Sequence, residues 1–433
     1  MRKKTDHNIQ LNLNVRGLGD SATLAINQTS ARLAAEGKQV YKLGLGQSPF
    51  PVPPSVVAAL QAHAAEKDYL PVRGLYALRE AVAAYHRRTQ HLDFCAENIL
   101  VGPGTKELMF LLQITYYGDL VVPSPSWVSY APQAQIIGRK VRWLATQEKN
   151  DWRLMPEDLA LFCSEDSSYP RIVILNYPAN PTGSTYPAAE LKALAKVARQ
   201  YKVILLADEI YSGLHHQGQH VSIARYYPEG TIVSNGLSKW CGAGGWRLGT
   251  FAFPPALQWL LEGMASVASE TYTSTSAPIQ YAAIEGFADN PDIDHYIALS
   301  RRICGALGRH ITKKLQQADV AVATPKGGFY LFPNFSAHAE NLRARGIEDG
   351  PTLCARLLDE TGVAILPGSD FGRPREELTA RLAYVDFDGG AALAALAASG
   401  NHPPAPESYL PRYCARVLEA VDRVIDWLKQ TED

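Results

Sequence analysis

The chain lacks any long run of apolar residues, and this excludes a membrane-spanning helix. Its longest apolar stretches, such as "VILLA" at 203–207, fall far short of the roughly 20 residues that a helix needs to cross a bilayer. The N-terminus begins with basic residues, but no continuous apolar core follows them. We therefore expect neither a membrane protein nor a secretory signal.

Cysteine and net charge are also scarce. Six cysteines are scattered over 433 residues without a CxxC pair, which favours reduced thiols in the cytoplasm over a disulfide framework or a zinc site. His215 and His216 are expected in a surface turn, without the further ligands that a metal requires. The formal net charge of −1 provides no field that would attract nucleic acid or an anionic membrane. We expect a cytoplasmic protein with no metal, nucleic-acid or membrane partner.

What the chain does contain is a regular alternation of apolar runs and amphipathic stretches. Strands are predicted in the runs at 98–102, 119–127, 171–183, 202–211 and 231–239. The stretches between them, for example 188–201, carry apolar residues at helical spacing. Continuous apolar strands separated by helices are typical of a parallel sheet covered on both faces. The predicted fold class is α/β, with a three-layer, doubly wound, mainly parallel sheet.

A change of pattern predicts a second, smaller domain of α+β type. A long helical segment near 290–317 precedes predicted strands at 327–335, 362–368 and 379–387, and a helix at about 408–430. Between them, 388–410 is partly an Ala-rich helix and partly a Pro-rich loop. We expect an N-terminal arm that belongs partly to the small domain at 1–46, a large domain at 47–295, and a small C-terminal domain at 296–433.

Polar side chains follow three of the predicted strands, at the edge where ligands bind in open α/β sheets. They are Asn176 and Asn180, then Asp208 and Tyr211, then Ser238 and Lys239. After the last strand, "SKWCGAGGWRLG" places Lys239 and Arg247 eight residues apart in a glycine-rich loop. So many glycines suit neither helix nor strand. The two cations indicate an anion site, and Lys239 is a candidate nucleophile.

Seven motifs in a fixed order carry a resemblance to a known family. They are "YLPVRGLYALREAVA" (69–83), "VGPGTKELMF" (101–110), "PSPSWVSY" (123–130), "NYPANPTG" (176–183), "ADEIY" (207–211), "GLSKWCGAGGWRLG" (236–249) and "TARLAY" (379–384). From about residue 20 onward, the chain resembles the fold-type I, pyridoxal-phosphate (PLP)-dependent class I aminotransferases, and most of all the bacterial aspartate/aromatic branch. The resemblance implies the PLP-transferase fold, with the cofactor in the large domain. The implied activity moves an amino group from an L-amino acid to a 2-oxo acid in ping-pong fashion.

The resemblance also implies roles for individual residues. Lys239 would carry PLP as a Schiff base, and Asp208 would face the pyridine nitrogen; both are the implied catalytic residues. The cofactor-binding set that it implies also includes Gly104, Thr105, Lys106, Trp127, Asn180, Tyr211, Ser238, Arg247, Tyr69 and Ser274. The implied substrate-binding residues are Gly46, Trp127, Asn180 and Arg381, with Arg381 clamping the α-carboxylate. Tyr69 and Ser274 would reach the neighbouring subunit, which implies a homodimer with shared active sites.

Departures from the family pattern leave the substrate open. Gly236 stands where many members have Ser, and Ser238 is the hydroxyl that can serve instead. In this branch a lysine at the position of Lys106 is associated with acidic substrates, but Gly19 and Asp20 replace a segment that often carries a basic residue. Trp127, Tyr130, or residues within 12–30 or 388–410 are the other candidates for specificity. Alternative functions are a carbon–sulfur β-lyase, a cyclising synthase, an oxidative deaminase, or a cofactor-binding regulator.

Overall fold

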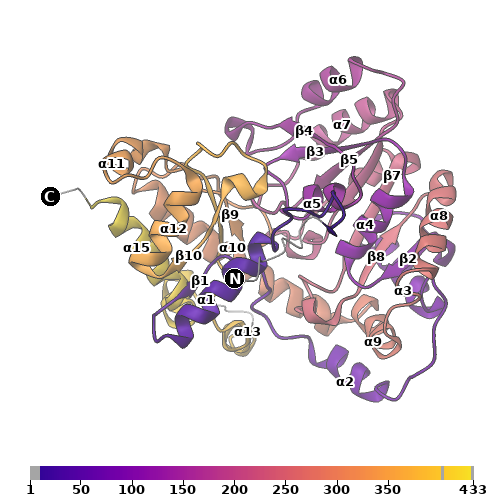
Figure 1. Cartoon of the computed structure of the whole chain (residues 1–433). Helices are drawn as coiled ribbons and strands as arrows, with labels where there is room; N and C mark the ends of the chain where they lie inside the picture. Colours follow the sequence, from indigo (N-terminus) through magenta and orange to yellow (C-terminus); the bar gives the residue numbers. More distant parts are fainter. Residues whose placement is uncertain (1–9, 401–403, 431–433) are drawn as a thin grey trace, which may run out of the picture.

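A seven-stranded sheet forms the centre of the larger part of the molecule (Figure 1). The computed structural model describes residues 10–400 and 404–430, so the basic N-terminal tail lies outside the described residues. In spatial order the strands are β2 (Ile99–Gly102), β8 (Gly249–Ala252), β7 (Thr231–Gly236), β6 (Ile204–Asp208), β5 (Arg171–Asn176), β3 (Asp119–Ser124) and β4 (Val141–Ala145). Only β8 runs antiparallel to its neighbours within this sheet. The prediction of a mainly parallel, doubly wound sheet is confirmed.

Helices cover both faces of this sheet because its strands are apolar on both sides. On β5, Ile172 and Ile174 pack into one cluster with α4 (Thr105–Thr115) and α8 (Gln258–Ser269). The alternate residues Val173 and Leu175 pack into another cluster with α6 (Pro156–Ser164) and α7 (Ala188–Gln200). Successive side chains on a strand point to opposite faces, so an uninterrupted apolar run buries both. The central strands are therefore buried on both faces. Their polar residues stand at the carboxyl ends of β5, β6 and β7, which lie at one edge of the sheet.

The smaller part combines the C-terminal elements with the N-terminal arm. Its short sheet has the order β11 (Leu366–Pro367), β12 (Ala380–Ala383), β9 (Tyr330–Leu331), all antiparallel. The strand β1 (Tyr41–Lys42) pairs in parallel with β10 (Val363–Ala364). In Figure 1, the indigo helix α1 (Ala22–Ala35) lies on the same side of the molecule as the orange and yellow elements, which include α12 (Gly350–Thr361) and α15 (Ala415–Leu428), and it contacts β11. The long helix α10 (Pro291–Gln316) leads from the large sheet into this part. These contacts support the domain division above, which we keep as a proposal.

Two sequence-based expectations differ from the structure. The single helix expected at about 408–430 is two helices, α14 (Pro406–Tyr413) and α15, separated at Cys414. Pro411 lies inside α14 and cannot donate a backbone hydrogen bond, which shortens that helix. The expectation that His215 lies in a surface turn is wrong. Its side chain is buried, and its backbone forms an antiparallel β-bridge with Gly327. The Ala-rich helix is α13 (Gly389–Ala398), and residues 401–403 of the following loop lie outside the described residues. Within the described ranges, no helix is long and apolar enough to cross a membrane.

Candidate active site

Lys239 lies in the loop that follows β7, and its side chain is partly buried. Its Nζ donates a hydrogen bond to the carbonyl oxygen of Gly46 at 2.8 Å and lies 5.6 Å from the centroid of the Tyr211 ring. Burial, and after it the positive charge of Arg381, lowers the pKa of Lys239 to about 8 against the opposing effect of Asp208. More of this amine is therefore uncharged near neutral pH than in an ordinary lysine.

Asp208 ends β6 on the same edge of the sheet, and its side chain is only 3% exposed. Its Oδ2 accepts a hydrogen bond from the Tyr130 hydroxyl at 2.5 Å, and its Oδ1 accepts one from the Ser234 hydroxyl at 3.4 Å. Burial raises the pKa of Asp208 to about 6, although both hydroxyls and the nearby Lys239 favour the charged form. Within the part of the chain that the structure describes, this buried carboxylate forms no ion pair.

Arg381, on β12, closes the site from the smaller part of the molecule. Its side chain is 1% exposed and lies over the rings of Tyr330 and Phe371, with the guanidinium carbon 5.0 Å from each ring centroid. One terminal nitrogen donates to Asn180 Oδ1 at 3.1 Å, and the other donates to the Gly44 carbonyl. The Nε atom of Arg381 is buried without a hydrogen-bond partner among the described residues. Such a guanidinium is fixed in place and available to a carboxylate.

Two asparagines connect Arg381 to Asp208. Asn176 Nδ2 donates to the main-chain carbonyl of Asp208 at 2.9 Å, and Asn176 Oδ1 accepts from the Asn180 amide at 2.7 Å. Because Asn180 then accepts from Arg381, the ends of β5 and β6 are tied to the smaller part through side chains. Asn176, Asn180, Asp208 and Lys239 therefore gather at one edge of the sheet, as the strand pattern suggests.

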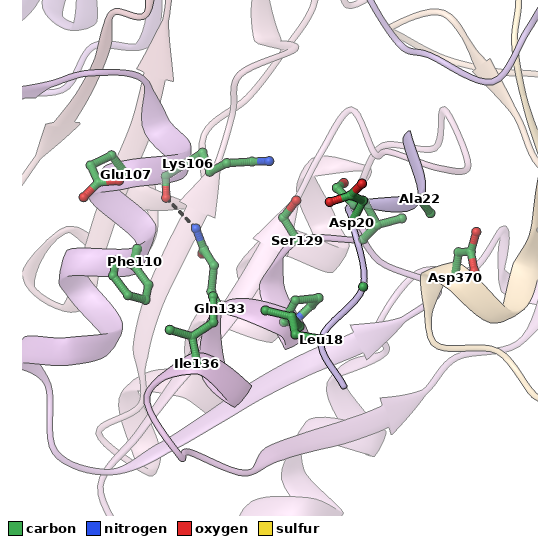
Figure 2. A pocket seen from close by; sticks show the side chains of 14 residues that line it. Leu18, Asp20, Ala22, Lys106, Glu107, Phe110, Ser129, Gln133, Ile136 and Asp370 are labelled. Atoms are coloured by element: carbon green, nitrogen blue, oxygen red, sulfur yellow. Dashed lines mark hydrogen bonds between the residues drawn. The ribbon is translucent and has the colours of Figure 1, made fainter. Parts of the chain in front are cut away.

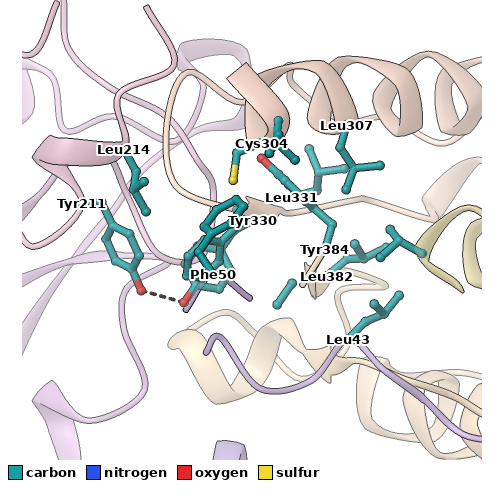
Figure 3. Close-up of a cluster of buried hydrophobic side chains, with 14 of the residues drawn as sticks. Leu43, Phe50, Tyr211, Leu214, Cys304, Leu307, Tyr330, Leu331, Leu382 and Tyr384 are labelled. Atoms are coloured by element: carbon teal, nitrogen blue, oxygen red, sulfur yellow. Dashed lines mark hydrogen bonds between the residues drawn. The ribbon is translucent and has the colours of Figure 1, made fainter. Parts of the chain in front are cut away.

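A pair of tyrosines holds the N-terminal loop over the site. Figure 3 shows the hydroxyls of Tyr211 and Tyr330 pointing at each other, 2.6 Å apart. The Tyr330 hydroxyl also donates to the Gly46 carbonyl at 3.4 Å. A Cβ atom added at Gly46 would lie 1.9 Å from that hydroxyl, so only glycine fits this close approach. Gly46 thus contacts both Tyr330 and Lys239.

A candidate anion site lies around Arg247, at the other end of the loop that begins near Lys239. Gly104, with φ of +89°, immediately precedes helix α4, which begins at Thr105. Arg247 also has a positive φ, of 57°, and donates to the carbonyls of Gly244 at 2.8 Å and Pro103 at 3.3 Å. A Cβ atom added at Gly104 would lie 2.1 Å from a terminal nitrogen of Arg247. A helix N-terminus beside a guanidinium is a favourable place for phosphate.

Trp127 and Lys106 form the boundary between this anion site and a cavity. Lys106 Nζ lies 5.2 Å from the Trp127 ring centroid, and burial, with Arg247 adding to it, lowers the pKa of Lys106. Beyond Lys106 lies a cavity of about 510 Å³, shown in Figure 2, with Asp20 and Ser129 on the side toward which the lysine points. Asp370 lines the far side; its pKa is raised by burial and lowered in part by Arg381. Neither Trp127 nor Arg381 is among the lining residues described; Lys106 connects the cavity to the indole, and the charge of Arg381 acts on Asp370.

Three predicted residues are less closely connected. Ser238 is partly buried next to Lys239, with no hydrogen bond of its hydroxyl described. Tyr69 is 90% exposed, and Ser274 lies in the turn after α8. No hydrogen bond or ion pair described for this chain joins Tyr69 or Ser274 to Lys239 or Arg247.

The sequence reasoning missed four contributors to the site. Tyr130 was considered only for specificity, although it contacts Asp208, and Ser234, Tyr330 and Gly44 were not considered. Tyr130 stands three residues after Trp127 in "SWVSY" and is the first residue of α5 (Tyr130–Ile136), so Trp127 lies shortly before this helix. The roles of Tyr330 and Gly44 depend on the packing of the smaller part against the sheet, which no local pattern indicates.

Comparisons with known proteins agree with this geometry. Residues 38–384 match the family described as aminotransferase class I and II. An aspartate aminotransferase of Geobacillus stearothermophilus is 34% identical over 371 residues, which cover 83% of this chain and 91% of that protein. An asparagine–oxo-acid transaminase of Streptococcus mutans is 29% identical, over 87% of this chain and 94% of that protein. The structure of a Thermus thermophilus aspartate aminotransferase with maleate has a TM-score of 0.81 at 28% identity, covering 96% of this chain and 99% of that one.

Proposed function

Because the chain belongs to aminotransferase class I and II, a family of PLP-dependent transferases, we propose that Lys239 is the residue that carries the cofactor. The activity expected from the sequence is confirmed: the protein is a PLP-dependent aminotransferase. The observation that supports the assignment to Lys239 is its amine of lowered pKa, placed near Asp208, Arg381 and Arg247. Each neighbour suits a different part of the cofactor or substrate.

The residues of the site fit PLP in charge and in shape. Burial raises the pKa of Asp208 to about 6, and a protonated pyridine nitrogen would supply a cation to pair with its charged form. Gly104 leaves room for the Arg247 guanidinium at the start of α4, where a phosphate would be held. Lys239 has an amine able to attack an aldehyde once it is uncharged. We propose that these residues, with Thr105, Lys106, Trp127, Tyr211 and Ser238, hold the cofactor.

In the proposed mechanism Lys239 moves the proton. When bound, PLP withdraws electrons from the substrate Cα and so makes its hydrogen acidic. Lys239 Nζ, in its uncharged form, would accept the proton that leaves the substrate Cα and would donate it again later in the half-reaction. Its lowered pKa suits this shuttle because the group must accept and donate a proton near neutral pH.

Arg381 and Asp208 hold the reacting parts in place. Arg381 binds the α-carboxylate that amino acids and 2-oxo acids share, so one site serves both half-reactions in turn. Asp208 would hold a negative charge toward the cofactor ring and so would favour its protonated form. Asn180 and Tyr211 would donate to the phenolic oxygen of the ring, and Gly46 would cover the substrate. The buried Arg381 and its rings exclude water from this end of the site.

We further propose that the substrate side chain enters the cavity beside Lys106. Lys106 and Asp370 both line the cavity. The positive charge of Arg381 acts on Asp370 and lowers its pKa in part, against the effect of burial. A side chain directed away from Arg381 therefore meets Lys106, the one lysine or arginine among the lining residues described. Aspartate and asparagine, named for the two relatives, are the first donors to test.

A homodimer with shared sites is also part of the proposal. Tyr69 is a large aromatic residue that is 90% exposed, and Ser274 lies in a loop without a bond to the site in its own chain. Both would then contact the phosphate bound by the other subunit. The six free cysteines agree with a location in the reducing cytoplasm, which we propose as well.

Two experiments test these assignments. Borohydride reduction of the yellow holoprotein, followed by peptide mapping, should place the cofactor on Lys239; a label elsewhere would exclude the assignment. An absorbance screen against the twenty amino acids, with and without a 2-oxo acid, should show a half-reaction that needs an acceptor to regenerate the starting spectrum. Release of pyruvate or sulfide without any acceptor would instead favour the β-lyase alternative.

A further inference from the structure

Tyr130 is a buried residue that contacts both sides of the proposed ring site. It is the first residue of α5 and is fully buried. Its hydroxyl donates to Asp208 Oδ2 at 2.5 Å. Its ring meets the Trp127 ring edge-on, with centroids 5.3 Å apart and planes at 85°. One side chain thus links the carboxylate at the edge of β6 to the indole before α5.

We propose that Tyr130 is a positioning residue that keeps Asp208 charged and oriented toward the cofactor nitrogen and holds Trp127 in its stacking position. This inference rests on the proposed function of Lys239 and Asp208, and it adds a residue that acts on the cofactor only through its neighbours. A carboxylate that loses a short hydrogen bond in a buried site is easier to protonate. Without Tyr130, the Asp208 carboxylate would also be less fixed in orientation, because its remaining side-chain donor, Ser234, is 3.4 Å away.

The groups around Asp208 indicate why Tyr130 has the largest effect. Ser234 donates from β7 at 3.4 Å, a much longer bond than the 2.5 Å bond from Tyr130. Lys239 and the Ile210 amide also favour the charged carboxylate, against the burial that disfavours it. The pKa of Tyr130 is raised well above 10, first by burial and then by the negative charge of Asp208. Tyr130 therefore stays protonated, and stays a donor, throughout the working pH range.

The chain contains a matched control at Glu209, the residue that follows Asp208 in the sequence. Glu209 is 1% exposed and accepts a hydrogen bond from the buried Tyr177 at 3.1 Å. Glu209 also pairs with His220, whose Nε2 is 2.9 Å from its carboxylate. Tyr177 and Tyr130 thus make the same kind of buried contact to successive carboxylates. Only the contact of Tyr130 involves a residue of the proposed site.

The test compares Tyr130→Phe, Tyr177→Phe and Ser234→Ala as purified holoenzymes. The readouts are the PLP dissociation constant between pH 5 and 9, the pH titration of the cofactor absorbance, and the thermal midpoint of each variant. Loss of one hydrogen bond to a charged group predicts roughly tenfold weaker PLP binding at pH 7 in Tyr130→Phe. The acidic limb of cofactor affinity should move to higher pH, because Asp208 is then protonated more readily. Ser234→Ala should change the PLP dissociation constant and its pH dependence less than Tyr130→Phe does.

The controls separate positioning from general destabilisation. Tyr177→Phe should lower the thermal midpoint but leave PLP affinity and the absorbance titration unchanged. The proposal is wrong if Tyr130→Phe leaves the PLP dissociation constant and the titration as in the parent enzyme, or if Tyr177→Phe shifts them equally. Failure of the proposed function would look different. In that case borohydride would not label Lys239 in the parent enzyme, whatever Tyr130 does.

Discussion

Replacing Arg381 by lysine tests how the site binds the α-carboxylate. Lysine retains the positive charge but loses the planar fork and the two fixed contacts, to Asn180 at 3.1 Å and to the Gly44 carbonyl. It also cannot lie flat between the rings of Tyr330 and Phe371, which now flank the guanidinium. The substitution therefore removes the geometry of the clamp without removing its charge.

The magnitude follows from burial. A hydrogen-bonded charge pair at a buried position contributes about 2 to 5 kcal/mol when one partner is truncated, which corresponds to roughly 30- to 5000-fold in affinity. Arg381 is 1% exposed, so solvent screens it little. Because lysine keeps the charge, we expect a loss at the lower end of this range, a decrease of roughly 30-fold in kcat/KM. The loss should be similar for the amino acid and for the 2-oxo acid, since both present the same carboxylate.

The assay follows the cofactor absorbance in each half-reaction, for an amino acid and for the amine that lacks its carboxylate. Arg381→Lys should lower kcat/KM for the amino acid and leave the much slower rate with the amine nearly unchanged. Arg171→Lys is the matched control, because Arg171 is also buried, at 3% exposure, but it begins β5 at the opposite edge of the sheet. Equal losses with amino acid and amine, or equal losses in the two variants, would refute the carboxylate role.

Three further predictions concern the cofactor. The rate at which the cofactor-free protein captures PLP should rise with pH through about 8, because the lowered pKa of Lys239 sets the fraction of uncharged amine; a flat stopped-flow profile would contradict this. Gly104→Ala should weaken PLP binding far more than binding of pyridoxal, which has no phosphate, because the new Cβ would lie 2.1 Å from Arg247; fluorescence titration of both ligands decides it. The pKa of Asp208 is raised from 3.8 to about 6 in the folded state. The charged carboxylate therefore lowers the free energy of unfolding, by an amount that grows from about pH 4 to pH 6 and is complete above that. Asp208→Asn should thus stabilise the cofactor-free protein by about 3 kcal/mol at pH 8 in urea unfolding, with no gain at pH 3.5, while weakening PLP binding.

Most of the sheet and one side of the site could be predicted because their signals are local. The apolar runs that become β5, β6 and β7 are bounded by polar residues, and parallel strands bring their carboxyl ends to one edge. This places Asp208 and Lys239 near each other without further information. The glycine between Pro103 and Thr105 likewise indicates a helix start that can bind an anion.

The other side of the site depends on contacts between distant segments. Tyr330 meets Tyr211 and Gly46, and Arg381 meets Gly44 and Asn180, across separations of more than a hundred residues. No periodicity in the sequence predicts which tyrosine reaches which loop. The family resemblance supplied Arg381 and Gly46, but it gave no indication of Tyr330. The apolar spacing around Pro411 continues past Cys414, so the spacing alone does not indicate that the last helix is split there.

The successive carboxylates Asp208 and Glu209 show how the surroundings, more than residue type, determine chemistry here. Both are buried, and burial alone would raise the pKa of each. Glu209 is compensated within the chain: His220 pairs with it and Tyr177 donates to it, and its pKa is lowered. Asp208 receives two hydroxyl donors and the Ile210 amide, but no ion pair is described for it, and burial keeps its pKa raised, to about 6. A buried charge without a direct counter-ion costs folding free energy, and a bound cation lowers that cost. The incomplete compensation of Asp208 therefore favours binding of a protonated ring nitrogen, whereas a histidine in the position of Ser234 would compete with it.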